Sequence, residues 1–342
     1  MRAPDFWYAP GPRGPASQVR SLLLAPLAVL YELGGRIRHS LSRPYTASVP
    51  IICVGNATAG GTGKTPFSIT LAHGLKALGH HPHIVTRGYG GNLLGPTLVD
   101  CQRHTAREVG DEPLLLAQIA PTWIAKDRRL GVEHAIVAGA DMIVMDDGLQ
   151  NPSVVKTVSL ILVDGELGFG NGQVIPAGPL RETVPRCFTR ADALILVGDE
   201  HPSTRTQIST WQGPVFHAHL EPDSRQIASG PHIAFAGIAR PEKFFATLDR
   251  LGVHLADRVA FPDHHAFTEA EFASLLKRAK AANARLITTA KDAVRLKPEY
   301  RGQVEVLPVA ATIASREAFG RFLIERLASK RSLLDKGARQ KR

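Results

Sequence analysis

A glycine-rich turn that ends in Lys64 and Thr65 has the residue types and spacing to hold the phosphates of a nucleotide. It follows an apolar run at residues 49–54 and precedes a helical pattern, the context in which phosphate-binding loops occur. Its glycines let backbone N–H groups point at an anion, and the helix adds the positive end of its dipole. Lys64 is expected to neutralise phosphate charge, and Thr65 to offer its hydroxyl to Mg²⁺. The residues predicted to bind the nucleotide are Thr58, Ala59, Gly60, Gly61, Thr62, Gly63, Lys64 and Thr65.

The match to the phosphate-loop pattern G-x-x-x-x-G-K-[ST] is incomplete at one position. Thr58 stands where the first glycine belongs, although Gly60 and Gly61 keep the loop flexible. A purely structural strand-to-helix turn is the alternative. The offset of Gly-Lys-Thr between an apolar run and a helical pattern favours phosphate binding.

Two further motifs place carboxylates where they could hold a metal ion or accept a proton. Residues 141–147 form an apolar strand pattern that ends in Asp146 and Asp147, which is typical of a Walker B element that holds Mg²⁺. Asp111 and Glu112 stand at the expected start of another helix, where carboxylates are favourable. Asp111 is either a general base or the N-terminal cap of that helix, and the residue pattern leaves both open.

An α/β fold with a mostly parallel sheet flanked by helices would position these motifs. Apolar runs separated by helical patterns predict further buried strands, at residues 83–91, 159–164 and 193–198. A loop rich in glycine and proline at residues 168–182 is expected at the ligand-binding edge of the sheet, where Arg181 could clamp phosphate.

The chain is expected to divide into four parts. Residues 1–44 hold an aromatic lead-in and an apolar helix, and residues 45–225 hold the phosphate-binding domain. A polar, loop-like stretch near residue 225 marks the boundary of a smaller α/β domain at residues 226–328. Residues 329–342 are rich in lysine and arginine and are expected to form a disordered basic tail.

The apolar helix, predicted at residues 17–33 and ended by Gly34 and Gly35, is too short to cross a bilayer. It contains Pro26 and Glu32 and follows a Phe-Trp-Tyr run of the kind found at membrane interfaces. We therefore expect an amphipathic helix that lies on an anionic membrane surface, with a helix packed on the protein's own core as the alternative. Four arginines bracket it, namely Arg20, Arg36, Arg38 and Arg43.

The composition is that of an ordinary folded protein with an acidic partner. The 342 residues are 44% hydrophobic and 21% charged, and the net charge of +10 indicates nucleic acid, an anionic membrane or a phosphorylated substrate. Aromatic residues make up only 6%, which argues against a base-stacking platform, and we expect no nucleic-acid partner. The three cysteines lack the spacing of a zinc site or a disulfide framework, which favours a reducing compartment.

Taken together, five stretches closely resemble the tetraacyldisaccharide 4'-kinase family of lipid A biosynthesis. The resemblance implies a fold like that of P-loop NTPases. It also implies transfer of the γ-phosphate of ATP, with Mg²⁺, to the 4'-hydroxyl of an acylated glucosamine disaccharide 1-phosphate, which gives lipid IVA. The resemblance places such an enzyme at the cytoplasmic face of the bacterial inner membrane, as a peripheral protein. The five stretches are residues 54–56 with 60–66, 86–91, 110–113, 146–150, and 170–182.

The resemblance also implies roles for single residues. Asp111 matches the carboxylate near the acceptor hydroxyl, and His264 matches its companion, although by itself His264 would be assigned to a solvated loop. The predicted catalytic residues are Asp111, His264 and Lys64; the predicted metal ligands are Thr65, Asp146, Asp147 and Glu112; the predicted substrate contacts are Arg181, Arg87 and Asn171.

Three positions depart from the family pattern and put detail around the site in question. Leu149, Asn151 and Ala290 stand where Phe, His and Glu are usual. The alternative function is a membrane-associated ATPase switch of the deviant Walker type, which shares the glycine-lysine loop and an amphipathic anchor. Such switches carry a lysine at the position of Ala59, so the kinase is favoured.

Overall fold

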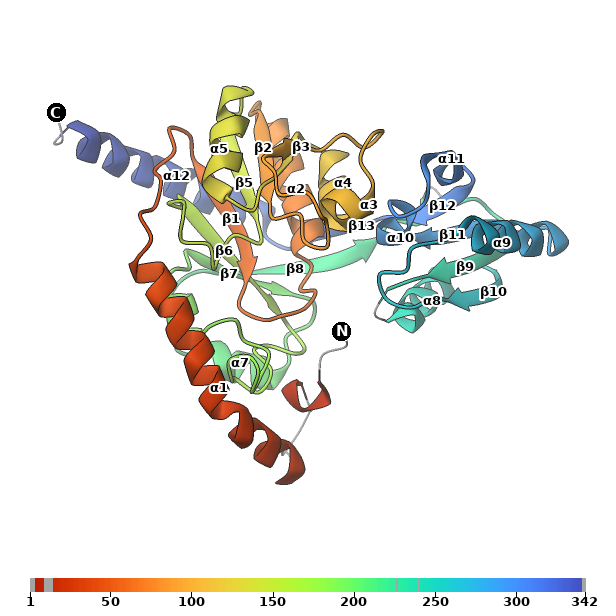
Figure 1. Ribbon diagram of the computed structural model, residues 1–342, viewed down its shortest axis with the longest axis horizontal. Coiled ribbons are helices and arrows are strands. Elements are labelled where there is room, and N and C mark those ends of the chain that lie inside the picture. Colours follow the sequence, from red (N-terminus) through yellow and green to blue (C-terminus); the bar gives the residue numbers. More distant parts are fainter. Residues whose placement is uncertain (1–3, 9–14, 226, 239, 340–342) are drawn as a thin grey trace.

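The computed structural model describes residues 4–8, 15–225, 227–238 and 240–339, and Figure 1 shows their arrangement. Two sheets divide these residues into a larger and a smaller α/β unit. The first residues of the expected N-terminal part (1–3 and 9–14) and the last residues of the expected tail (340–342) lie outside the described residues.

The larger unit is built on a nine-stranded sheet in the order β13-β8-β7-β6-β1-β5-β2-β4-β3. Neighbouring strands are parallel except at the two edges, where β13 pairs antiparallel with β8 and β3 with β4. This confirms the predicted mostly parallel sheet. The strands are β1 (Ile51–Asn56), β2 (Pro82–Thr86), β3 (Thr97–Leu98), β4 (Thr122–Ile124), β5 (Met142–Asp146), β6 (Val158–Asp164), β7 (Ala193–Val197), β8 (Val215–Pro222) and β13 (Val309–Ile313).

Helices cover both faces of this sheet, which is why its central strands are almost wholly apolar. On one face, α2 and α12 meet through an edge contact between Phe67 and Phe319. On the other face, α1 and α5 contribute Ala28 and Val132 to the core. The helices are α1 (Pro15–Ser40), α2 (Lys64–Ala77), α3 (Ala106–Val109), α4 (Asp111–Ala117), α5 (Arg128–Val137), α6 (Val184–Phe188), α7 (Pro202–Ile208) and α12 (Arg316–Arg339), with the 3-10 turn η1 (Asp5–Trp7).

The smaller unit has its own parallel sheet and its own core. Its four strands follow the order β10-β9-β11-β12, and Phe235 and Phe272 lie fully buried between sheet and helix. The elements are β9 (His232–Ala236), α8 (Pro241–Arg250), β10 (Leu255–Ala260), α9 (Glu269–Ala281), β11 (Arg285–Thr289), α10 (Ala290–Ala293), α11 (Pro298–Arg301) and β12 (Val304–Leu307).

The end of the chain differs from the predicted domain limits. From residue 309 onward the chain returns to the larger unit, because β13 pairs with β8 and α12 packs on the large sheet. The smaller unit thus ends near residue 308 and not at 328. The tail predicted to be disordered after Ser329 is helical to Arg339, as a continuation of α12.

Helix α1 is also longer than predicted. It continues through Gly34 and Gly35 to Ser40, because each glycine costs a helix only about 1 kcal/mol and the pair does not by itself end it. Leu24 and Ala28 face the core, while most of its other apolar side chains are exposed. Among the described helices, none combines the length and apolar character needed to cross a bilayer.

Candidate active site

The predicted phosphate loop connects β1 to α2, and its geometry follows from its glycines. Gly60 and Gly63 adopt positive φ angles of 132° and 76°, which side chains disfavour, so the backbone can turn tightly into the helix that begins at Lys64. The loop is tied to the glycine-rich segment 168–182 by two backbone bonds: Ala59 N donates to Pro179 O at 2.7 Å, and Arg181 N to Ala57 O at 2.7 Å. The loop is thereby held in place before any anion binds.

Lys64 lies between two polar groups at the end of the central strands. Its Nζ donates to Asn56 Oδ1 at 3.0 Å and lies 3.6 Å from Asp147 Oδ1. Arg181 Nη1 contacts both oxygens of Asp147, at 2.9 and 3.0 Å. Although burial acts to raise the pKa of Asp147, Lys64 and Arg181 together hold it below its usual value. Asp147 is therefore the counter-ion of the two cations that could face phosphate.

Asp146 lies next to the loop because β5 is the parallel neighbour of β1, with Asp146 opposite Val54. It is fully buried, and Ser68 Oγ donates to its Oδ1 at 2.8 Å. Within the described chain its Oδ2 and the hydroxyl of Thr62 have no partner. Burial, with repulsion from Glu112 and Asp147, raises the pKa of Asp146 to about 7.

These groups fit the Mg²⁺ ion that the fold implies. Mg²⁺ is usually held by one or two carboxylates and completes its shell with phosphate oxygens and water. The unpartnered oxygen of Asp146 and the hydroxyl of Thr65, the second residue of α2, are oxygen ligands of the kind that Mg²⁺ prefers. In the part of the chain that the structure describes, no cluster of three or more His, Cys, Asp or Glu side chains could hold a metal by itself.

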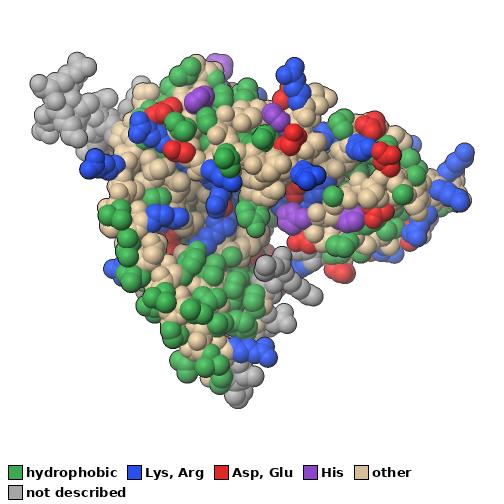
Figure 2. Space-filling view, in the orientation of Figure 1, with side chains coloured by type: hydrophobic (Ala, Val, Ile, Leu, Met, Phe, Trp, Pro, Cys, Tyr) green, Lys and Arg blue, Asp and Glu red, His purple; other side chains and the backbone are tan. Residues whose placement is uncertain are grey.

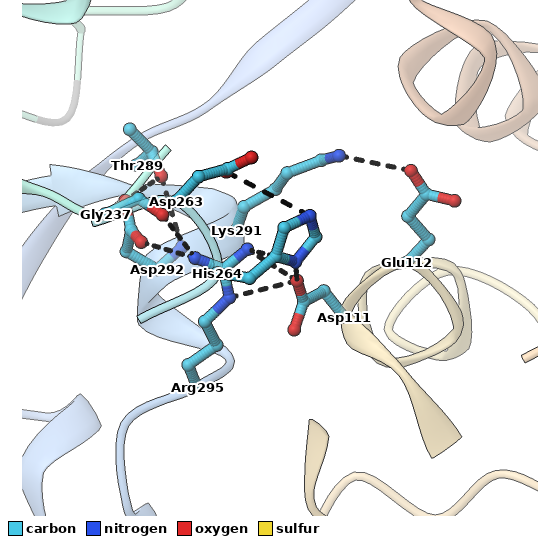
Figure 3. A network of polar contacts seen from close by, with 9 residues as sticks. All are labelled: Asp111, Glu112, Gly237, Asp263, His264, Thr289, Lys291, Asp292 and Arg295. Atoms are coloured by element: carbon cyan, nitrogen blue, oxygen red, sulfur yellow. Dashed lines mark hydrogen bonds and ion pairs between the residues drawn. The ribbon is translucent and has the colours of Figure 1, made fainter. Parts of the chain in front are cut away.

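A second group of polar residues joins the two units, as Figure 3 shows. Asp111 is the first residue of α4 in the larger unit, and His264 follows β10 in the smaller unit. His264 Nδ1 lies 3.1 Å from Asp111 Oδ2. The N-cap of α4 is Gly110, without a side-chain capping bond, so Asp111 is not the cap that the sequence left open.

Arg295 holds Asp111 from the other side, and no motif in the sequence points to this arginine. Its Nε and Nη2 donate to Asp111 Oδ2 at 2.9 and 2.5 Å, and its Nη1 donates to Gly237 O and Asp292 Oδ1 at 2.7 and 2.9 Å. The side chains of Arg295 and Asp292 are 5% and 0% exposed. Asp111 Oδ1 accepts no bond from any residue that the structure describes and remains open to a ligand.

Glu112, a predicted metal ligand, forms an ion pair with the smaller unit. Its Oε1 accepts from Lys291 Nζ at 3.1 Å, which makes a second ion pair between the two units. The pairing leaves the predicted metal role of Glu112 without direct geometric support, although its charge contributes to the raised pKa of Asp146. Val294 packs with Leu114 in an apolar cluster at the same junction.

A family model described as Tetraacyldisaccharide-1-P 4'-kinase matches residues 20–328. The chain belongs to this family.

Similar proteins extend the match along both chains. A Tetraacyldisaccharide 4'-kinase of Rhodospirillum centenum is 49% identical over 333 residues, covering 96% of this chain and 98% of its own. One of Parvibaculum lavamentivorans is 51% identical over 299 residues, covering 86% and 87%. The crystal structure of LpxK from Aquifex aeolicus in complex with ATP has a TM-score of 0.71 and 26% identity, covering 90% of this chain and 99% of that one.

The three departures from the usual pattern of the 4'-kinase family have structural roles here. Leu149 is buried and packs directly on Gly55. A Cβ on Gly55 would lie 2.6 Å from the Cβ of Leu149, so only glycine at position 55 leaves room for this leucine. Asn151 Oδ1 accepts from Ser153 N at 2.9 Å and shapes the turn after β5. Ala290 packs against the apolar cluster between the two units.

Two of the predicted substrate contacts in this 4'-kinase family member, Asn171 and Arg87, differ in their surroundings. Asn171 is 8% exposed; its Nδ2 donates to Ala177 O at 2.8 Å and its Oδ1 accepts from Gln173 N at 3.0 Å. Both polar groups of Asn171 are thus used inside the loop, and the predicted substrate contact has no support from this geometry. Arg87 is exposed directly after β2, at the same edge of the sheet as the phosphate loop.

Proposed function

We propose that the chain transfers the γ-phosphate of ATP to the 4'-hydroxyl of tetraacyldisaccharide 1-phosphate, an acylated glucosamine disaccharide, and so forms lipid IVA. One observation carries this proposal: a phosphate loop with Lys64 and an open carboxylate oxygen on Asp111 occur in one chain of the 4'-kinase family. The ATP bound by the Aquifex aeolicus protein supports ATP as the donor.

The loop and its cations would hold the transferred phosphate. Backbone amides of residues 58–63 and the start of α2 would face the anion, and Lys64 and Arg181 would supply positive charge where negative charge spreads in the transition state. Asp147 keeps both cations in place. Thr65 and Asp146 would hold Mg²⁺, which supplies further charge neutralisation on the phosphates.

Asp111 would accept the proton of the 4'-hydroxyl through its open Oδ1. The 4'-oxygen then forms a bond to the γ-phosphorus, and the bond from that phosphorus to the β–γ bridging oxygen breaks, leaving ADP. His264 and Arg295 contact only Oδ2, so they orient the carboxylate and leave Oδ1 free. They act as positioning residues, because neither contacts the reacting atoms.

Helix α1 would bring the enzyme to its lipid substrate. Leu22, Leu23 and Leu30 are 74%, 73% and 64% exposed, and Figure 2 shows apolar side chains gathered along this part of the surface. Such an apolar strip with flanking arginines suits the interface of an anionic membrane. We place the protein at the cytoplasmic face of the bacterial inner membrane as a peripheral protein, with no nucleic-acid partner.

The deciding experiment incubates the purified protein with γ-labelled ATP, Mg²⁺ and acylated disaccharide 1-phosphate. The expected result is label in the lipid and ADP in equal amount. Label released only as inorganic phosphate, at a rate independent of the acceptor, would instead identify an ATPase switch.

A further inference from the structure

A pocket of about 500 Å³ lies between α1 and α6 and is not used by the chemistry described above. Its walls come from the last two turns of α1, whose residues recur every three or four positions on one face, and from one face of α6. We call it the α1–α6 pocket. It is lined by Glu32, Arg36, His39, Ser40, Thr183, Pro185, Arg186 and Thr189.

The cations of the α1–α6 pocket are largely unpaired. Among the described residues Arg36 has no hydrogen-bond or ion-pair partner, and Arg186 only approaches Glu182, at 3.8 Å. Glu182 is already engaged by Arg190 and by Gln150 Nε2, the latter at 3.0 Å. The guanidinium groups that line the pocket therefore keep their hydrogen-bond donors for a ligand.

The surroundings add to this positive charge. Burial lowers the pKa of His39, and Arg190, Arg186 and Lys156 lower it further, which shows that cations outweigh carboxylates here. Glu32 is the single carboxylate of the lining, and it accepts a bond from Thr183 at 3.4 Å. Guanidinium and hydroxyl donors around one point are a set that suits a phosphate monoester.

The ligand of this pocket should be amphiphilic and should reach the active site. On α1 the pocket adjoins exposed Leu33 and Ile37, each 50% exposed. On its other side, Thr183 follows two residues after Arg181, whose guanidinium contacts Asp147. A molecule with one end in the active site beside Arg181, apolar chains on α1 and a phosphate in the pocket would satisfy all three regions.

We infer that the α1–α6 pocket binds the 1-phosphate of the acylated disaccharide while its 4'-hydroxyl reaches Asp111. This inference rests on the proposed function, and it assigns Arg36 and Arg186 as the residues that distinguish the phosphorylated acceptor from one with a free hydroxyl at position 1. A phosphate monoester carries more charge than the diester of an ordinary phospholipid, which favours it as the occupant of a site with several cations.

The test measures kcat/KM in uncharged detergent micelles for two acceptors, the acylated disaccharide 1-phosphate and the same lipid with a free 1-hydroxyl. The wild type should prefer the phosphate. In the Arg36→Gln/Arg186→Gln variant this preference should fall by about 10- to 100-fold, the scale of lost charge-assisted hydrogen bonds. Arg36→Gln alone, at an exposed and unpaired position, should lower it without affecting folding. Arg103→Gln, an 86% exposed arginine elsewhere in the larger unit, should leave the preference unchanged.

Two other outcomes would overturn the inference in different ways. If the double variant keeps the full preference but binds vesicles of anionic phospholipid less well, the pocket holds a membrane headgroup and not the substrate. If the wild type phosphorylates neither acceptor, the proposed function itself fails. If the double variant transfers phosphate with an unchanged preference for the 1-phosphate acceptor, the inference about the α1–α6 pocket is rejected and the proposed function stands.

Discussion

Lys64 could be identified from sequence because its role depends on neighbours within one loop. Asp146 follows the same logic, since it ends a local strand pattern, whereas the role expected of Asp111 came from the resemblance to the 4'-kinase family. Arg295 could not be found in this way, because its partners are 184 and 3 residues away and an arginine after a short helix is common. The sequence thus indicated the groups that are proposed to carry the chemistry, but it did not indicate Arg295, which is proposed to orient one of them.

Replacing Lys64 with alanine should lower kcat by about 10²–10³-fold, the usual cost of removing one charged donor from a transition state. The loop should still form, because its backbone bonds, from Ala59 N to Pro179 O and from Arg181 N to Ala57 O, do not involve the lysine side chain. Label transfer and the melting temperature check this together. Lys76→Ala, an exposed lysine at the end of α2, serves as the control. Near-normal turnover in a folded Lys64→Ala variant would remove the loop from the mechanism.

Asp111→Ala should lower kcat by about 10²–10⁴-fold with little change in the KM for ATP, the scale of a positioned general base. His264→Ala should cause a smaller loss, because it contacts only Oδ2 of the base. The double variant should resemble Asp111→Ala alone, since residues that act as a unit do not give additive losses. Losses that multiply would show that His264 acts on another group, such as a substrate phosphate.

Arg295→Met should lower kcat by about 10- to 100-fold while the KM for ATP stays constant, because Asp111 loses its orienting donor. Arg295→Lys should be impaired as well, since one ammonium cannot bridge Asp111, Asp292 and Gly237 O together. The unpaired Asp292 should also destabilise the protein by about 3–5 kcal/mol.

A stability defect alone would not show that Arg295 positions the base. Added guanidinium ion should therefore restore part of the kcat of the Met variant at a temperature where the protein is folded. Arg278→Met removes an exposed ion pair with Asp257 in the same unit. This control variant should keep its kcat, and guanidinium should not change it. Failure of guanidinium to raise kcat would reduce Arg295 to a structural role.

At the scale of elements, the interior strands were predictable and the peripheral elements were not. β1, β5 and β6 are continuous apolar runs because helices cover both faces, and such runs are visible in sequence. β13 is an edge strand with exposed Val309 and Ala310, so it lacks that signal. The length of α1 was underestimated, because Gly34 and Gly35 weaken a helix without ending it.

The exposed side of α1 should control membrane binding without contributing to folding. Substituting Leu22, Leu23 and Leu30 together by glutamine should weaken binding to anionic vesicles by more than about 100-fold, because each buried leucine contributes roughly 1.5–3 kcal/mol. The melting temperature should stay within a degree or two, since all three are exposed. Ala28→Asp, at a position 6% exposed in the core, should instead lower the melting temperature and leave vesicle binding by the folded protein unchanged. Unchanged vesicle binding in the triple variant would assign α1 to the protein's own architecture.

At the scale of the whole molecule, the smaller unit is an insertion between two strands of the large sheet. β8 leads into it and β13 leads out, and the two strands pair antiparallel with Pro222 opposite Val309. Asp223 N also donates to Pro308 O at 2.9 Å, so the chain enters and leaves at one place. His264 and Arg295 reach Asp111 only because this insertion folds back on α4. A linear pattern cannot show such a return.

This topology predicts that the smaller unit can be removed without unfolding the larger one. Joining Asp223 to Pro308 through an Asn-Gly turn would convert β8 and β13 into a hairpin of favourable geometry. The shortened protein should unfold cooperatively and bind ATP, because the loop, Lys64 and Asp146 lie in the larger unit. It should transfer no phosphate to lipid, since Asp111 has lost both groups that orient it.

Calorimetry, nucleotide titration and label transfer measure the three properties separately. Wild-type transfer by the shortened protein would show that the catalytic site is complete within the larger unit, while loss of ATP binding in a folded protein would show that the smaller unit helps to hold the nucleotide.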